Sequence, residues 1–256
     1  MQTARDETHA FYADRATDVA KLDDRMHRLV EECVRAKPQS VIDLGCGRGF
    51  LLRALERRLP GLQCFGVELS DSAIDEARAN GITVFHQSLS TGLPLGDETV
   101  DLAVMGEVIE HLFDPDACIE EVRRVMRPGG TLIVTTPNLV SWLNRGLVMM
   151  GIQPIFSETS TRKKYGHWLG LLGQGKTNTQ GHLKLFTLGA LRELLKDLGF
   201  DVERVEGYKF YLLAEHPVAN VIESIFRLRP TLASGFIVTA RKPLGSIVSA
   251  SQPSAR

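Results

Sequence analysis

Cysteine is scarce in this sequence, and long apolar runs are missing from it. Only four of the 256 residues are cysteines, and no two of them form a Cys-x-x-Cys pair. Because no such pair and no secretory segment are present, we expect reduced thiols and a cytoplasmic location. The longest apolar stretch, residues 139–156, is interrupted by Asn144, Arg145, Gln153 and Pro154. It is therefore too short and too polar to span a bilayer.

The sequence also lacks an excess of charge of either sign. It has 30 Lys and Arg residues against 31 Asp and Glu residues, a formal net charge of −1. Such a chain has no long-range field to attract nucleic acid or an anionic membrane, so neither is an expected partner without a local patch of charge. Hydrophobic residues make up 43% of the chain, enough for one main domain with an inserted or appended piece. Monomer and homodimer both remain open.

The most informative stretch is residues 40–52. An apolar strand pattern reaches Asp43, glycines occupy every second position from 45 to 49, and a helical pattern of leucines follows. Glycine adopts positive φ and has no Cβ, so the backbone of such a turn can approach a ligand closely. Position 50 is Phe, so the G-x-G-x-x-G spacing of a dinucleotide site is not met, and no phosphate-loop Gly-Lys-Ser/Thr follows. A plain strand-to-helix turn without a ligand is the alternative.

This pattern of Asp43, Gly45, Gly47 and Gly49 resembles motif I of the class I S-adenosylmethionine (SAM) methyltransferases. The resemblance runs from Val41 to Asn138 and includes the Arg-Pro-Gly-Gly turn at 127–130. It implies that SAM is the cofactor and that the acid and the three glycines bind its methionine end.

Further acids follow apolar stretches at strand-like positions. Glu68 comes about 20 residues after the glycines, where a carboxylate accepts hydrogen bonds from a ribose diol. Glu107 follows a later stretch and is also expected at the cofactor pocket. The family usually places an acid after the third strand to bind the adenine amine, but here the residues are His86, Gln87 and Ser88. Ser88 is the expected substitute, with Gln87 as the alternative.

The alternation of strand and helix patterns predicts an α/β, doubly wound, Rossmann-like fold with seven strands. The family resemblance implies the strand order 3-2-1-4-5-7-6, with the last strand antiparallel and a lid insert after strand five. We expect an N-terminal capping helix (1–38), a SAM-binding core (39–138), an acceptor-binding lid insert (139–182), the C-terminal part of the core (183–244) and a disordered tail (245–256).

A second candidate group begins with Glu107, Glu110 and His111. Their i, i+3, i+4 spacing would place all three on one helical face if the chain turned helical after the fourth strand. Two carboxylates and an imidazole could hold a divalent metal, Mg²⁺ or Mn²⁺, with His182 as a fourth ligand. A bound metal lowers the pKa of an acceptor hydroxyl, which makes the hydroxyl easier to deprotonate. His111 or His182 is the expected catalytic base that accepts its proton.

The set of two acids and two histidines resembles the small-RNA 3′-end 2′-O-methyltransferases, which hold a divalent ion against a ribose diol. Ubiquinone-pathway O-methyltransferases share the Glu-x-x-Glu-His part. In the alternative interpretation no metal binds: Glu107 contacts the pocket, Glu110 is structural, and His111 packs or acts as a base.

The expected lid places aromatic residues (Tyr165, His167, Trp168) beside cationic ones (Arg162, Lys163, Lys164). Such a surface suits sugars and acidic acceptors. Residues 137–156 and 181–188 resemble bacterial methyltransferases that modify saccharides and secondary metabolites. The expected function is therefore O-methylation of a small-molecule or saccharide acceptor. An N- or C-methyltransferase acting on a small metabolite, or an idle SAM-binding regulatory domain, is the alternative.

Overall fold

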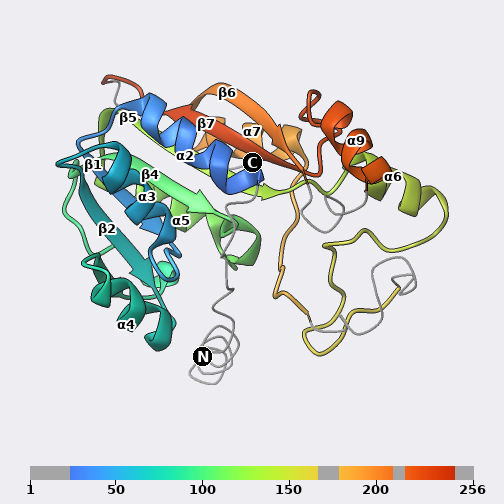
Figure 1. Ribbon diagram of the computed structural model, residues 1–256, viewed down its shortest axis with the longest axis horizontal. Helices are drawn as coiled ribbons and strands as arrows, with labels where there is room; N and C mark the ends of the chain where they lie inside the picture. Colours follow the sequence, from blue (N-terminus) through green and yellow to red (C-terminus); the bar gives the residue numbers. More distant parts are fainter. Residues whose placement is uncertain (1–23, 167–178, 210–216, 246–256) are drawn as a thin grey trace, which may run out of the picture.

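A seven-stranded sheet with helices on both faces forms the centre of the molecule (Figure 1). The structure, a computed structural model, describes residues 24–166, 179–209 and 217–245. The strands are β1 (Ser40–Leu44), β2 (Gln63–Glu68), β3 (Thr83–His86), β4 (Val100–Gly106), β5 (Met126–Pro137), β6 (Asp201–Tyr208) and β7 (Gly235–Arg241). Their order is β3-β2-β1-β4-β5-β7-β6. β7 pairs antiparallel with both β5 and β6, whereas the pairs among β1 to β5 are parallel. The predicted order and the antiparallel last strand are confirmed.

The helices separate into two layers. They are α2 (Asp24–Ala36), α3 (Phe50–Arg58), α4 (Asp71–Ala79), α5 (Pro115–Val125), α6 (Trp142–Met149), α7 (Leu188–Asp197) and α9 (Pro217–Phe226), with short 3₁₀ turns η1 (Leu89–Thr91) and η2 (Ile109–His111). α2, α3 and α4 share one hydrophobic core on one face of the sheet, and α5 and α7 share another on the opposite face. Within the described part of the chain, no helix has both the length and the apolar character needed to cross a membrane.

Strand side chains alternate between these two cores. In β1, Val41 packs with α2 and α3, while Ile42 and Leu44 pack with α5. Successive side chains of a strand point to opposite faces, so Asp43 lies on the same face as Val41 and α2. Asp43, the acid of motif I, is therefore on the side of the sheet that α2 covers.

Several helices begin at a side-chain cap. Asp114 accepts a hydrogen bond from the backbone of Ala117, and Pro115 occupies the first turn of α5. Thr187 caps α7 in the same way. Ser70 caps α4, which begins at Asp71.

The segment after β5 differs from the sequence-based expectation. It contains a regular helix, α6, capped by Ser141, which the expected lid insert did not include. β5 itself begins at Met126, before the predicted Pro-Gly-Gly turn, and its register shifts there. The proposed division of the chain into segments stays a prediction. Most of its first and last segments lie outside the described residues.

Candidate functional site

The candidate site lies where the parallel strands β1, β2 and β4 end. The turn after β1 has left-handed backbone at Gly45 (φ 70°), Gly47 (φ 51°) and Gly49 (φ 76°). A Cβ added at Gly47 would meet no atom within 4 Å, whereas one at Gly45 would lie 2.8 Å from Val108 Cγ2. Gly47 therefore faces open space beside the strand ends. Ligands in such sheets bind outside these carboxyl ends.

Glu68 ties this turn to β2. Its Oε2 accepts a hydrogen bond from the backbone N–H of Gly47 at 2.8 Å, and its Oε1 accepts from Leu69 and Ser70 at 2.6 and 2.9 Å. A carboxylate has about four acceptor positions, so one stays available to a ligand. Glu68 is thus next to the glycine turn, as expected, and also holds it in place.

Asp43 is 5% exposed at the end of β1. Burial, and then the nearby charge of Glu68, raise the pKa of its carboxyl to about 8, although Arg25 on α2 acts in the opposite direction. At neutral pH this acid is therefore largely protonated in the free protein. A cationic ligand group beside it would favour release of that proton.

Ser88 follows β3 and caps the turn η1. Its Oγ accepts from the backbone of Ser90 and lies 2.8 Å from the Ser90 hydroxyl. Gln87 donates its side-chain N–H to Gly92 O at 2.7 Å. Both expected adenine contacts are thus engaged within their own loop, and the adenine role of Ser88 stays a prediction.

The expectation that Glu107 shares a helical face with Glu110 and His111 is wrong. Glu107 has left-handed backbone (φ 59°), and the short turn η2 begins only at Ile109. The physical reason is pairing with the neighbouring strand: the Glu107 N–H donates to Thr135 O at 3.1 Å. Its Oε1 accepts hydrogen bonds from the hydroxyls of Thr135 and Tyr208, each at 2.8 Å. Glu107 therefore points to β5 and β6.

Glu110, His111 and His182 do come together. Each offers one ligand atom, and these atoms lie within 4.8 Å of one another. Glu110 is fully buried; its Oε2 accepts from the Thr136 hydroxyl at 3.0 Å, while its Oε1 has no partner among the described residues. Burial, followed by the charge of Glu107, raises the pKa of Glu110 well above its usual range. A buried oxygen without a partner beside two imidazoles is the donor pattern of a cation site.

The two histidines are oriented alike. His111 Nδ1 lies 3.1 Å from Gly181 O, and His182 Nδ1 lies 3.0 Å from Phe156 O. A carbonyl only accepts, so each Nδ1 carries the proton and each Nε2 keeps its lone pair. Burial lowers the pKa of His182. Both rings, with centroids 4.8 Å apart, are thereby held in the form that binds a metal or accepts a proton.

Glu158, which the sequence did not single out, supports the segment that carries His182. Its carboxylate accepts backbone N–H groups from Gln180, Gly181 and His182, at 2.6, 2.8 and 3.2 Å. Lys164 lies 3.4 Å from the same carboxylate. In the sequence, Glu158 is one acid in a polar stretch, and no spacing marks it. Of the expected lid aromatics, Tyr165 is exposed, while His167 and Trp168 lie outside the described residues.

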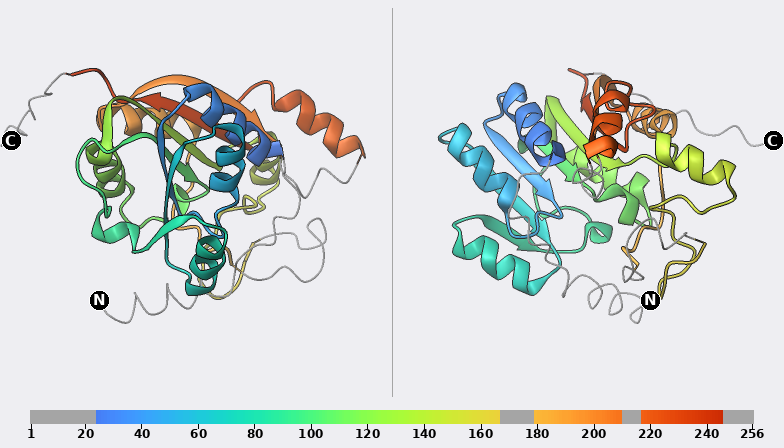
Figure 2. Two further views of the ribbon diagram at one scale, coloured as in Figure 1. Left: turned by 60° about the vertical axis from the view of Figure 1, so that its left-hand side comes forward. Right: turned by 45° about the vertical axis from the view of Figure 1, so that its right-hand side comes forward.

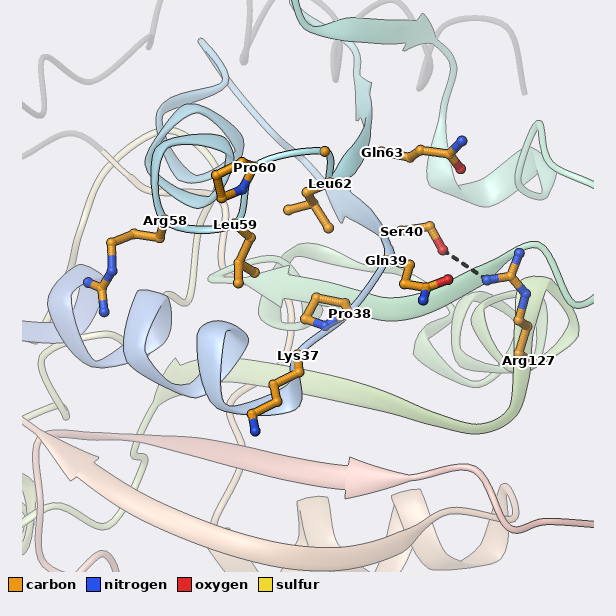
Figure 3. Close-up of a pocket in the computed structure, with 11 residues that line it drawn as sticks. Lys37, Pro38, Gln39, Ser40, Arg58, Leu59, Pro60, Leu62, Gln63 and Arg127 are labelled. Atoms are coloured by element: carbon orange, nitrogen blue, oxygen red, sulfur yellow. Dashed lines mark hydrogen bonds between the residues drawn. The ribbon is translucent and has the colours of Figure 1, made fainter.

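A pocket of about 490 Å³ lies at the opposite end of the strands from the glycine turn, where β1 and β2 begin. Figure 3 shows the residues that line it. Its arginines are paired, Arg58 with Glu31 and Arg127 with Asp101. Ser40 also accepts a hydrogen bond from Arg127 at 3.3 Å. The pocket is remote from the glycine turn, and we do not include it in the candidate site.

Comparison with known proteins decides the family. Residues 13–205, about three quarters of the chain, match the family described as "Methyltransferase domain". The chain belongs to this methyltransferase family. A relative described as a probable SAM-dependent methyltransferase, from Mycolicibacterium smegmatis, is 34% identical over 125 residues, 46% of this chain and 46% of the relative. The match thus spans less than half of either protein.

Two further comparisons cover more of this methyltransferase-family chain. The ubiquinone biosynthesis O-methyltransferase of Methylococcus capsulatus is 24% identical over 211 residues, 80% of this chain and 77% of the relative. A SAM-dependent methyltransferase structure from Archaeoglobus fulgidus has a TM-score of 0.55 at 21% identity, covering 85% of this chain and 92% of that one. The fold is therefore shared, and the family implies SAM as the cofactor.

The methyltransferase residues described above fit this cofactor. The open backbone at Gly47, the buried acid Asp43 and the anchored carboxylate Glu68 converge from two neighbouring strands. They offer a close backbone approach and acceptors for an amine and a diol, which are groups that SAM carries.

Proposed function

We propose that this protein is a SAM-dependent O-methyltransferase that acts on a hydroxyl of a sugar, glycan or related metabolite, assisted by a divalent metal. The observation that carries the proposal is the buried Glu110 oxygen, which has no hydrogen-bond partner among the described residues, with ligand atoms of His111 and His182 within 4.8 Å of that carboxylate. Residues of a merely structural cluster would satisfy one another.

In this proposal Asp43, Gly45, Gly47 and Gly49 bind the methionine end of the cofactor, and Glu68 binds its ribose. Ser88 contacts the adenine. SAM supplies an electrophilic methyl group on a sulfonium. The chain's part is to hold the cofactor so that the acceptor oxygen lies in line with that group.

Glu110, His111 and His182 are the proposed ligands of Mg²⁺ or Mn²⁺, and such an ion would lower the pKa of an acceptor hydroxyl. Glu107 is the proposed fourth ligand, although its Oε1 is bonded to Thr135 and Tyr208. An Nε2 that binds the ion has no lone pair left for a proton, so the base would be whichever of the two imidazoles the ion leaves uncoordinated. Burial favours neutral His182 for this step, because it lowers the pKa of that ring.

Transfer to oxygen is supported by the Methylococcus relative, which is named an O-methyltransferase. The sugar acceptor is supported by the sequence of residues 139–182, in which lysine and arginine are close in sequence to aromatic residues. N- or C-methylation, and an idle SAM-binding domain, are the alternatives. RNA is not the expected acceptor, because the chain as a whole carries almost no net charge.

The direct test is transfer of a labelled methyl group from SAM to a panel of saccharides, other hydroxyl compounds and amines. We expect products with the methyl group on oxygen, loss of turnover in EDTA, and recovery with Mg²⁺ or Mn²⁺. Cofactor binding without turnover over the whole panel would favour the idle domain. Products methylated on nitrogen or carbon would contradict the O-methyl assignment.

Binding of S-adenosylhomocysteine at pH 7 should release close to one proton from Asp43. The free carboxyl, with a pKa of about 8, is mostly protonated, and the ligand's ammonium group would favour the carboxylate. Affinity should accordingly rise by roughly tenfold per pH unit from about pH 6 to 7.5. Calorimetry in buffers of different ionisation enthalpy measures the proton. The Asp43→Asn variant serves as the control and should release none; zero net release by the parent would disprove this role.

A further inference from the structure

Large apolar side chains are exposed on two helices, and on the turn that follows the second of them, at one end of the molecule. They form what we name the α6–α9 surface, and they are 56% to 88% exposed: Val148, Met149, Val218, Val221, Ile225 and Leu228. Three of them, Val218, Val221 and Ile225, follow i, i+3, i+7 spacing and lie on one face of α9. A stripe of this kind is normally covered by another apolar surface.

The opposite side of α9 is fixed to the protein. Trp142 of α6 stacks on Phe226 with ring centroids 5.4 Å apart, and its Nε1 donates a hydrogen bond to Glu223. Ser234 donates to the same carboxylate at 2.8 Å. Figures 1 and 2 show α6 and α9 side by side at this end. The exposed stripe is therefore the outward face of an anchored helix.

The exposed charged residues of the two segments that carry this surface are arginines. Residues 142–150 and 217–232 contain Arg145, Arg227 and Arg229, and Glu223 is the one acid among them. Glu223 is buried, whereas Arg145 and Arg229 are exposed. The chain as a whole has a net charge of −1, so this is a local excess of positive charge.

We propose that the α6–α9 surface docks on an anionic lipid bilayer. Apolar side chains on one face of a helix enter the interfacial region of a bilayer, and neighbouring arginines contact anionic headgroups. A second copy of this chain fits less well. A twofold contact would bring Arg145 and Arg229 close to their own copies, and the described residues 142–150 and 217–232 contain no exposed acid to compensate. The inference goes beyond the proposed function and does not depend on the acceptor.

The test is co-sedimentation of the full chain with vesicles of phosphatidylglycerol and phosphatidylcholine. We expect binding to vesicles that contain phosphatidylglycerol and little binding to pure phosphatidylcholine. Leu228→Glu should lower the partition coefficient by about tenfold or more, through lost apolar burial and added negative charge. Arg229→Gln should lower it by about fivefold. The matched control is Leu244→Glu, since Leu244 is 80% exposed outside this surface, and it should bind as the parent does.

Titration with S-adenosylhomocysteine checks that each variant is folded. Failure of the parent to bind anionic vesicles would overturn the proposal. So would equal binding to both lipids, or equal losses for Leu228→Glu and Leu244→Glu. Light scattering tests whether a second copy of the chain occupies the surface instead. If the parent is a dimer that does not bind vesicles, and Leu228→Glu dissociates it, the surface is a dimer interface.

Discussion

Replacement of Glu110 by glutamine should lower methyl transfer by about 100-fold or more and leave the affinity for S-adenosylhomocysteine nearly unchanged. Glutamine keeps the volume of the buried side chain and an oxygen for the Thr136 hydroxyl, which donates to Glu110 at 3.0 Å. It removes the charge that a cation ligand needs. Initial rates with Mn²⁺, alongside calorimetry of the cofactor product, separate the two effects.

The matched control for this variant is Glu32→Gln. Glu32 is also a buried glutamate, 3% exposed, but it bonds Thr239 and lies away from the site. Its substitution should alter stability and leave the rate per folded molecule unchanged. Full activity of Glu110→Gln, together with full activity in excess EDTA, would exclude a metal role. His111 or His182 would then act as a base alone, with a rate that falls as the pH drops through the imidazole range.

The second large effect concerns Glu68. Replacement by alanine should raise the Kd for S-adenosylhomocysteine by about 10-fold to 100-fold, since hydrogen bonds to a charged group contribute about 1.5 to 3 kcal/mol. The variant loses the acceptor for the Gly47 backbone and the proposed acceptor for the ribose. Glu68→Gln keeps one acceptor oxygen, so its Kd should lie between those of the parent and Glu68→Ala.

A cofactor product without the 2′-hydroxyl separates these two roles of Glu68. If the carboxylate binds the ribose, the parent should lose affinity for this analogue, and Glu68→Ala should bind both compounds equally. If the parent and Glu68→Ala lose the same factor in affinity when the 2′-hydroxyl is removed, Glu68 does not bind the ribose and only holds the glycine turn. Parent-like affinity of Glu68→Ala for both compounds would exclude either role.

The sheet could be predicted well because its signals are local. β1 and β4 are buried on both faces and read as continuous apolar runs, which is typical of central parallel strands. The glycines after β1 take the positive φ that their spacing implied. The strand order came from family resemblance, because no local pattern specifies which strands are neighbours.

The candidate site was harder to predict, for two physical reasons. The spacing of Glu107, Glu110 and His111 fits a helix, but hydrogen bonds to Thr135 decide the backbone at Glu107. Tyr208, which donates to Glu107, is 101 residues away in sequence, and no periodicity links such positions.

The approach of His182 to Glu110 has a similar origin. Backbone N–H groups of Leu183 and Lys184 donate to Glu110 O at 2.8 and 3.0 Å. Asn138 at the end of β5 forms a bridge with Phe186. The sequence named both functional residues, but only these long-range backbone contacts explain their meeting.

The Glu158 contacts have a consequence for protein engineering. Phe156 orients the His182 ring, and Glu158 binds three consecutive amides up to that histidine. A chimaera that replaces residues 139–166 alone with a segment of a related enzyme would separate these partners. The transplant boundary should instead fall after His182, so that the segment proposed to bind the acceptor is inherited with the contacts that orient this imidazole.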